Sequence, residues 1–278
     1  MDKDSREAWL IEDAEVGDPP TGLWARRDVL VSDGRIRRVA DDISESEASR
    51  TVNGVLRVVC GKGLWVWPGL VDLHVHFREP GLTHKEDLLS GVGAALRGGY
   101  TCVVCEPNTL PPIDCPELVS DLHAKALRET AVRVFYKAAM TAGREGKKPA
   151  EIEALARMNR VVALSDDGDP IVAPDVLEEV CRRAARVGLP LSPHCEDSDR
   201  SLKAYREGRN PGFDPGPPYT NESRYIERDT CTAVEWGCPV HFSHVSREES
   251  LDFLRDFRRC NPCATVTLGV TPHHLILS

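Results

Sequence analysis

Short apolar runs alternate with stretches of helical periodicity along most of the chain after residue 68. The runs have the length of strands, and the stretches between them repeat apolar residues at spacings of three and four. Strands are predicted over residues 70–76, 100–105, 132–139, 161–164, 189–194, 239–244 and 264–270. Regular alternation of this kind favours parallel strands joined by right-handed helical crossovers.

Capping signals indicate where some of the intervening helices begin. Thr83 with Glu86, and Ser246 with Glu249, have the residue types and spacing of capping boxes. The first of these helices stops at Gly98-Gly99. The other helices are predicted over 116–129, 149–158, 174–187 and 222–236.

This pattern predicts an α/β fold, a (β/α)8 TIM barrel that lacks its eighth strand. A doubly wound open sheet is the alternative, but no Gly-rich phosphate loop follows the first strand, which weakens the nucleotide-binding version of that fold. The start of the chain reads differently, as short strands around the hairpin signal Ser32-Asp33-Gly34. We therefore expect a partial β-sandwich over 1–66 and an incomplete barrel over 67–278.

Charge and hydropathy exclude several classes of protein. The net charge of −9 argues against a nucleic-acid partner, and 41% hydrophobic residues argue against a disordered chain. No apolar run is long enough to span a membrane, and the polar first seven residues do not have the pattern of a signal peptide. These features predict a cytoplasmic protein without a membrane partner.

Ten cysteines raise the question of a structural metal site. Two Cys-x-x-Cys pairs occur, Cys102/Cys105 and Cys260/Cys263. The first lies in a predicted strand, where residues three apart point to opposite faces, so one ion cannot readily take both. Reduced, mostly buried thiols are the favoured interpretation of the cysteines, and structural zinc is the minor alternative.

Histidines fall at the ends of predicted strands, where β/α barrels carry their chemistry. His74 and His76 end the first strand, His194 the fifth and His244 the sixth, and Asp166-Asp167 follows the fourth. Residues two apart on a strand share a face, so His74 and His76 can bind one ion together. His-x-His alone is weak evidence, because many histidines in strands are core or surface residues, but the other three strand ends strengthen it.

A carboxylate at the same rim can bridge two ions, although both Asp166 and Asp167 lie at that strand end. Two metals about 3.5 Å apart can hold a bridging hydroxide and polarise a carbonyl. His84, His123 and His241, by contrast, are expected on the surface or on helices.

Several motifs follow one another along the chain in a recognisable order. The first runs from residue 68 to residue 81 and contains His74, His76 and Arg78. The others are Gly98-Gly99-Tyr100-Thr101, Glu106-Pro107-Asn108-Thr109, Ser165-Asp166-Asp167-Gly168, Pro193-His194-Cys195-Glu196-Asp197, His241-Phe242-Ser243-His244-Val245-Ser246 and Val270-Thr271-Pro272-His273-His274-Leu275. Together they resemble the dihydroorotases, a family of zinc-dependent cyclic amidohydrolases. The resemblance implies an amidohydrolase-type barrel with a small N-terminal β-sandwich. It also implies the reversible cyclisation of N-carbamoyl-L-aspartate to (S)-dihydroorotate in pyrimidine biosynthesis.

The resemblance also implies roles for individual residues. Two zinc ions would be held, the first by His74 and His76 and the second by His194 and His244, with Asp167 as the bridge. Arg78 and Asn108 would bind the substrate's carboxylate, a task that suits the forked guanidinium of arginine. A surface salt bridge with Glu79 or Glu86 is the alternative for Arg78.

Two features distinguish this chain within the wider group. Hydantoinases, allantoinases and some dihydroorotases bridge their metals with a carboxylated lysine on the fourth strand, and residues 161–165 contain no lysine. The chain thus resembles the bacterial dihydroorotases that use aspartate instead, and a hydantoinase or allantoinase is the alternative function. Glu106 is a departure, because the family usually has methionine before Pro-Asn.

The resemblance places one further functional residue after Ser278: an aspartate on the eighth strand that binds the first zinc and moves the proton. We therefore expect a fragment, a chain completed by another polypeptide, or a protein without activity of its own. The last would be a non-catalytic partner of aspartate transcarbamoylase, although the intact ligand set argues against it. A homo-oligomer or a complex with aspartate transcarbamoylase is the partner that the resemblance implies.

Overall fold

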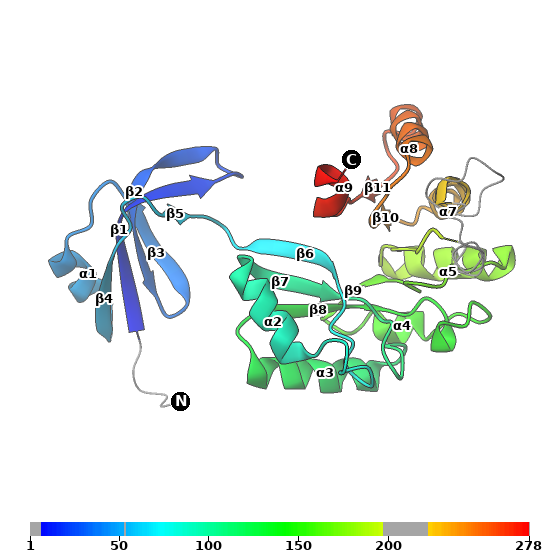
Figure 1. Ribbon diagram of the computed structural model, residues 1–278, viewed down its shortest axis with the longest axis horizontal. Coiled ribbons are helices and arrows are strands. Elements are labelled where there is room, and N and C mark those ends of the chain that lie inside the picture. The colour runs from blue at the N-terminus through cyan, green and yellow to red at the C-terminus, as the bar shows by residue number, and fades with distance from the viewer. Residues whose placement is uncertain (1–6, 53, 197–221, 278) are drawn as a thin grey trace. The chain divides into compact units, whose positions relative to one another are not determined.

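The computed structural model describes residues 7–52, 54–196 and 222–277. The polar residues 1–6 at the N-terminus, and Asp197 at the end of the motif that begins with Pro193, lie outside the described residues. The chain divides into two compact units, Met1–Gly69 and Leu70–Ser278 (Figure 1). Each is described by itself below.

The N-terminal unit is built on one β-sheet with the strand order β3-β2-β1-β4. Its strands are β1 (Glu7–Asp18), β2 (Leu23–Ser32), β3 (Arg35–Ala40), β4 (Val55–Cys60) and the short β5 (Trp65–Val66), which pairs with β1. The predicted hairpin is confirmed: Asp33 and Gly34 join β2 to β3, both with positive φ, as a tight turn of this kind requires. A short helix, α1 (Glu45–Thr51), contributes Ala48 to the small core around Leu10 and Leu30.

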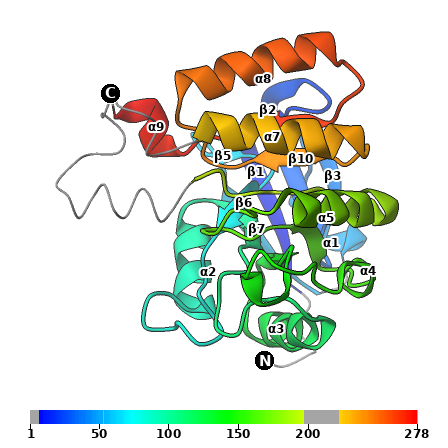
Figure 2. The ribbon, with the colours of Figure 1, turned by 90° about the vertical axis from the view of Figure 1, so that its right-hand side faces the viewer.

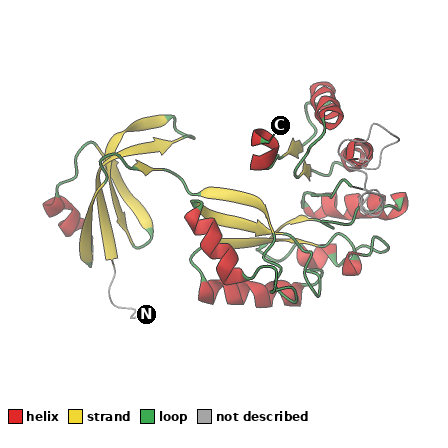
Figure 3. Cartoon of the chain, viewed as in Figure 1, coloured by secondary structure: helices red, strands yellow, loops and turns green. Residues whose placement is uncertain are grey.

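The larger unit contains parallel strands separated by helices, as the alternating pattern predicts (Figure 3). Strands β6 (Leu70–Val75), β7 (Tyr100–Cys105), β8 (Arg133–Ala138) and β9 (Val161–Leu164) pair in that order, all parallel. Leu191 continues the series through single bridges to Leu164 and Val240. Strands β10 (Val240–Phe242) and β11 (Val266–Leu268) then follow, also parallel. Spatial order thus equals chain order, which is the arrangement of a β/α barrel wall.

Helices connect these strands and lie along the outside of the wall (Figure 2). They are α2 (Leu88–Arg97), α3 (Pro116–Glu129), α4 (Ile152–Leu155), α5 (Pro174–Val187), α7 (Glu222–Glu235) and α8 (Glu248–Cys260); a 3-10 turn, Ala142–Arg144, and a short α9 (Pro272–Ile276) complete the described elements. Their buried faces form one continuous core with the strands; its fully buried members include Leu164, Leu177 and Phe242. This core fixes the strand ends on which the site is built.

Both predicted capping boxes are wrong. Helix α2 begins after Asp87, whose carboxylate accepts a 2.9 Å hydrogen bond from the Ser90 backbone N–H, with Ser90 returning the contact. Helix α8 begins after Arg247, whose side chain makes no capping hydrogen bond. Glu222, a residue of α7, instead accepts from the N–H groups of Ser246 and of the N-cap residue Arg247. Local spacing could not reveal a cap that comes from another helix.

Two predicted elements are shorter than their patterns indicate. The strand expected over residues 189–194 is reduced to the single bridging residue Leu191. The helix expected over residues 149–158 is the four-residue α4, since Ala150 N–H is taken by the Met140 carbonyl at 2.9 Å. Both segments lie next to the loops that carry the site. Their backbone N–H and C=O groups form hydrogen bonds with those loops instead of within a helix or a strand.

Candidate metal centre

The end of β6 presents two imidazoles to one point. His74 and His76 lie on the same face of the strand, and their Nε2 atoms are 3.2 Å apart. Each Nε2 lies 3.7 Å from an oxygen of Asp167, His74 from Oδ1 and His76 from Oδ2. Neutral nitrogen lone pairs and a carboxylate converging in this way are a donor set for a divalent metal.

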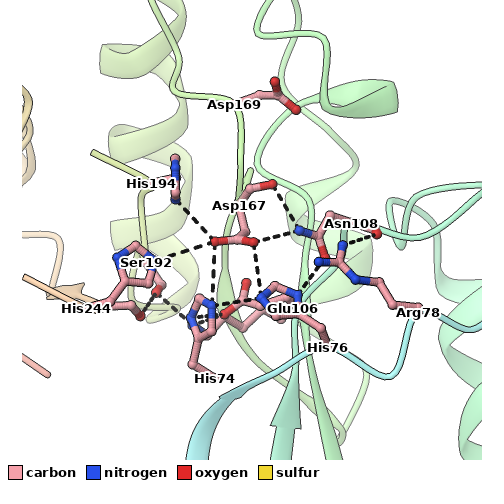
Figure 4. Close-up of polar contacts among 12 residues, drawn as sticks. His74, His76, Arg78, Glu106, Asn108, Asp167, Asp169, Ser192, His194 and His244 are labelled. Atoms are coloured by element: carbon pink, nitrogen blue, oxygen red, sulfur yellow. Dashed lines mark hydrogen bonds and ion pairs between the residues drawn. The ribbon is translucent and has the colours of Figure 1, made fainter. Parts of the chain in front are cut away.

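Asp167 follows β9 and is buried, with 6% of its surface exposed. His194 Nδ1 lies 3.4 Å and His244 Nε2 lies 3.9 Å from its Oδ1, on the side away from His76 (Figure 4). The described residues therefore contain two groups that could hold a metal ion, His74–His76–Asp167 and Asp167–His194–His244, and they share one carboxylate. All five residues picked from the sequence as ligands are brought together.

The neighbouring aspartate has a different environment. Asp166 is fully buried and accepts hydrogen bonds from the backbone N–H groups of Met140 and Thr141, at 2.8 and 3.2 Å, and from the Thr141 hydroxyl. It anchors the loop after β8 and does not face the histidines. Of the two aspartates that end this strand, Asp167 is the one that faces the histidines.

The ring nitrogens that face away from Asp167 also have partners. His76 Nδ1 lies 3.0 Å from Asn108 Oδ1, and His194 Nε2 lies 3.1 Å from Glu196 Oε2. His74 Nδ1 lies 2.8 Å from Oε1 of Glu106. Acceptors on the far side of metal-binding histidines fix which nitrogen carries the proton and leave the other free for the metal.

Electrostatics concentrate negative charge on Asp167. Burial by itself raises the pKa of this carboxyl, but the nearby rings of His194 and His244, together with His74, lower the pKa well below its usual range. His194 shows the reciprocal effect: burial lowers its pKa, while Asp167 and Glu196 raise it to about 9. Burial lowers the pKa of His76. The shared carboxylate therefore lies in surroundings that favour its charged form.

One buried ring nitrogen tests whether these residues fit a metal ion. His194 Nδ1 is buried and has no hydrogen-bond partner among the described residues, although it points at Asp167. A buried polar atom left unpaired is costly, and a metal ion between His194 and Asp167 would satisfy it. The residues present therefore fit a metal ion bound at this position.

The two predicted substrate ligands lie beside the first group. Arg78 donates from Nη1 to the Asn108 carbonyl at 3.3 Å, and among the described residues it forms no ion pair with a carboxylate. The alternative salt bridges with Glu79 and Glu86 do not form; Glu79 instead pairs with Lys125. Arg78 and His244 both have positive φ, +54° and +44°, a backbone conformation that clusters at functional sites.

Several residues around the site are not indicated by the sequence pattern. Lys137, in β8, is buried and pairs with Glu106, and Arg144 donates to the Asp167 carbonyl and, at 2.7 Å, to Asp169. His241 lies half-buried in β10 rather than on the surface; its pKa is lowered by burial and by the nearby charges of Lys137 and His74. A lysine inside the apolar run of 132–139 was the signal that could have revealed the first of these.

Comparison with known proteins identifies the family of this chain. A family model described as Dihydro-orotase-like matches residues 63–250. The chain belongs to this family. Among curated proteins, this dihydro-orotase-like chain is 34% identical over 272 residues to a dihydroorotase of Aquifex aeolicus, covering 97% of this chain and 62% of that protein. It is 35% identical over 261 residues to one of Staphylococcus epidermidis, covering 92% and 59%. It thus spans about three fifths of the length of these relatives.

Solved structures show the fold of the dihydro-orotase-like chain. An L-hydantoinase from Arthrobacter aurescens superposes with a TM-score of 0.75 at 18% identity, covering 97% of this chain and 59% of that one. A D-hydantoinase superposes with a TM-score of 0.76 at 19% identity, covering 98% and 59%. The predicted fold class, an amidohydrolase-type β/α barrel, is confirmed. Among the described helices, none has the length and apolar character needed to cross a membrane.

Proposed function

We propose that the protein is a dihydroorotase, which interconverts N-carbamoyl-L-aspartate and (S)-dihydroorotate with two bound zinc ions. The observation that carries the proposal is the position of Asp167, whose single carboxylate faces His74 and His76 on one side and His194 and His244 on the other. The relatives named dihydroorotase support it further.

In this proposal the two ligand groups hold one ion each. His74, His76 and Asp167 bind the first, and Asp167, His194 and His244 bind the second. Zinc supplies a Lewis acid and a water of lowered pKa, which is what hydrolysis of a ring amide near neutral pH needs. Asp167 holds the ions together, and the acceptors behind His76 and His194 keep the ring nitrogens oriented.

Arg78 determines which substrates fit. Its guanidinium lies next to the His-x-His motif and has no carboxylate partner among the described residues. A guanidinium binds a carboxylate through two parallel hydrogen bonds, and dihydroorotate carries a carboxylate on its ring carbon. Asn108, whose backbone carbonyl accepts a hydrogen bond from Arg78, would complete the same pocket. Proton transfer to the ring nitrogen is assigned, by resemblance, to the aspartate expected after Ser278, so the proposal concerns the activity of the whole protein.

A hydrolase of neutral cyclic ureides, such as a hydantoinase, fits less well. Such enzymes would need a lysine at the end of β9, and β9 has the sequence Val161-Val162-Ala163-Leu164. Lys137 does not replace it, because this lysine lies in β8 and its Nζ contacts Glu106 and Ser192.

The direct test is an assay of the complete gene product in both directions, after removal of metal and after addition of zinc. The expected result is turnover of dihydroorotate that chelation abolishes and zinc restores, with little turnover of dihydrouracil, hydantoin or allantoin. A His76→Ala variant serves as the inactive control. Preference for a neutral ring would favour the hydantoinase alternative, and absence of both metal binding and turnover would contradict the proposal.

Location and partners follow from the same proposal. All ten cysteines are free, which suits the reducing cytoplasm in which we place the enzyme. A homo-oligomer or a complex with aspartate transcarbamoylase is the proposed assembly, to be tested by co-purification. A complex formed without zinc or turnover would favour a non-catalytic partner.

A further inference from the structure

A buried ion pair lies directly behind the first group of metal ligands. Glu106 follows β7 and Lys137 lies in β8; their side chains are 0% and 3% exposed, and Lys137 Nζ contacts Glu106 Oε1. Removing two charges from water is costly, and a hydrophobic pair of the same size is often as stable. A contribution to stability therefore does not explain this pair, and its contacts with neighbouring residues indicate a different role.

The nearest neighbour of Glu106 is a metal-ligand candidate. His74 Nδ1 lies 2.8 Å from the same carboxylate oxygen, Oε1. This separation is within the range of a hydrogen bond from a ring N–H to a carboxylate, and both atoms are buried. The opposite ring nitrogen, Nε2, is the one that faces Asp167 and His76. Glu106 thus lies on the correct side of the ring to hold its proton.

The next ligand along β6 has a matching partner from the same strand end. Asn108 Oδ1 lies 3.0 Å from His76 Nδ1, and Asn108 and Glu106 are two residues apart, as His76 and His74 are. The backbone register explains the match, because Glu106 N–H donates to the Val75 carbonyl at 2.9 Å. Adjacent parallel strands therefore place each acceptor opposite one histidine (Figure 4).

Lys137 ties this carboxylate to the other half of the site. Its Nζ donates a 2.8 Å hydrogen bond to Ser192 Oγ, which lies 3.4 Å from Ser243 Oγ. Ser192 and Ser243 stand two residues and one residue before His194 and His244.

We propose that Glu106 is a positioning residue for His74, holding Nδ1–H so that Nε2 faces the first metal ion, and that Lys137 is the counter-ion that makes this possible inside the barrel. The inference rests on the proposed metal site. It explains why Glu106 departs from the methionine that the resemblance leads one to expect. Carboxylate and ammonium add opposite charges, so the pair leaves the net charge around the metals unchanged.

Two double variants separate the positioning role from the ion pair. Glu106→Met with Lys137→Met removes both charges and the acceptor. Glu106→Gln with Lys137→Met also removes both charges but keeps an oxygen that can accept from Nδ1–H. The two proteins differ at position 106 alone, where only glutamine offers an amide oxygen to accept from Nδ1–H, and neither leaves an uncompensated charge in the core. Both are compared with the wild-type chain for the affinities of two Co²⁺ ions, measured by chelator competition and by the visible absorbance of each site.

If Glu106 positions His74, the two double variants should differ in their affinity for the first metal ion. The methionine double variant should bind the first ion about 10- to 100-fold more weakly, as for other lost partners of metal-binding histidines, with the second ion little changed. The glutamine double variant should bind both ions within a few-fold of wild type. Equal affinity for the first ion in all three proteins would overturn the positioning role and leave the metal site intact. No metal binding by the wild-type chain would overturn the proposed function and this inference with it.

A measurement on the unmodified sequence does not depend on how the variants fold. Long-range ¹⁵N–¹H spectra report which nitrogen of each histidine carries a proton, and a His74→Gln variant assigns the signal. In the zinc-loaded chain, His74 should show a protonated Nδ1 with zinc on Nε2. A protonated Nε2, or zinc on Nδ1, would contradict the proposal.

Discussion

Asn108 donates a 2.6 Å hydrogen bond from Nδ2 to Oδ2 of Asp167, joining the end of β7 to the carboxylate shared by both ligand groups. The same side chain lies against His76 through its oxygen. An asparagine expected to bind substrate therefore also holds two of the proposed metal ligands. The proposed function therefore couples substrate binding and metal binding through this one residue.

Replacing Asn108 should consequently affect both properties. Asn108→Ala removes the donor to Asp167 and the acceptor behind His76, so we expect zinc affinity to fall about 10-fold or more and kcat/KM with it. Zinc titration and steady-state assays measure the two effects. Asn159→Ala, an exposed asparagine outside the site, is the matched control. Unchanged zinc affinity in Asn108→Ala would show that the contacts of Asn108 with His76 and Asp167 do not contribute to zinc binding.

Arg78 should discriminate between substrates by their carboxylate. Arg78→Met should lower kcat/KM for dihydroorotate about 10- to 100-fold, which corresponds to about 1.5 to 3 kcal/mol for hydrogen bonds to a charged group. The residual activity on dihydrouracil, which has no carboxylate, should change little. Arg157→Met, at an exposed site, is the control. An equal loss on both substrates would indicate that Arg78 supports the fold rather than the substrate.

Glu222 provides the cap that α8 lacks in its own sequence. Its carboxylate accepts from the backbone N–H groups of Ser246 and Arg247, both at 3.1 Å, and from the hydroxyls of Ser246 and Ser250, at 2.6 and 2.7 Å. Glu222→Ala should lower the free energy of unfolding by about 1–2 kcal/mol, the upper range for a lost cap. Denaturant unfolding measures this, with exposed Glu227→Ala of the same helix as control. Equal stability of the two variants would refute the capping role.

The ion pair between Glu153 and Arg183 predicts a dependence of stability on pH. Hydrogen bonds from Arg183, which links α5 to α4, lower the pKa of Glu153 from 4.5 to about 2. A carboxyl whose pKa is lowered by folding stabilises the fold above its ordinary pKa, and this contribution is lost as the pH falls towards 2. Because the pair is partly exposed, Glu153→Gln should cost only about 0.5–1 kcal/mol at pH 7.

Urea unfolding of the wild type and Glu153→Gln at pH 7, 5 and 3 measures the difference. It should be similar at pH 7 and 5 and smaller at pH 3. Glu145→Gln, which removes a largely exposed contact with Lys147, should show little difference at any pH. A difference that grows on acidification would contradict the sign of the linkage.

The strand ends of the barrel could be read from the sequence, but their supporting contacts could not. His74, His76, His194 and His244 each follow an apolar run, and a parallel fold brings such positions to one rim. Asp167 needed the resemblance, because only the structure shows that Asp166 turns to the loop after β8. The segment before His194 looks like a strand from its residues, yet only Leu191 pairs with neighbours.

Long-range polar contacts explain most of what the sequence did not reveal. Lys137 is a single charged residue in an apolar run, and no local sequence pattern predicts that it forms an ion pair with Glu106. Glu222 caps α8 from 24 residues away, so the local signal at Ser246 and Glu249 was misleading. Periodicity records which face of an element is buried, but not which buried polar groups meet there.

The central claim is that Asp167 is shared by two zinc ions, and anomalous scattering at the zinc edge from crystals grown with zinc tests it most directly. The account predicts two peaks, one among His74, His76 and Asp167 and the other among Asp167, His194 and His244. Absence of an anomalous peak next to Asp167, or a zinc peak only at Cys260 and Cys263, would contradict the shared two-zinc site.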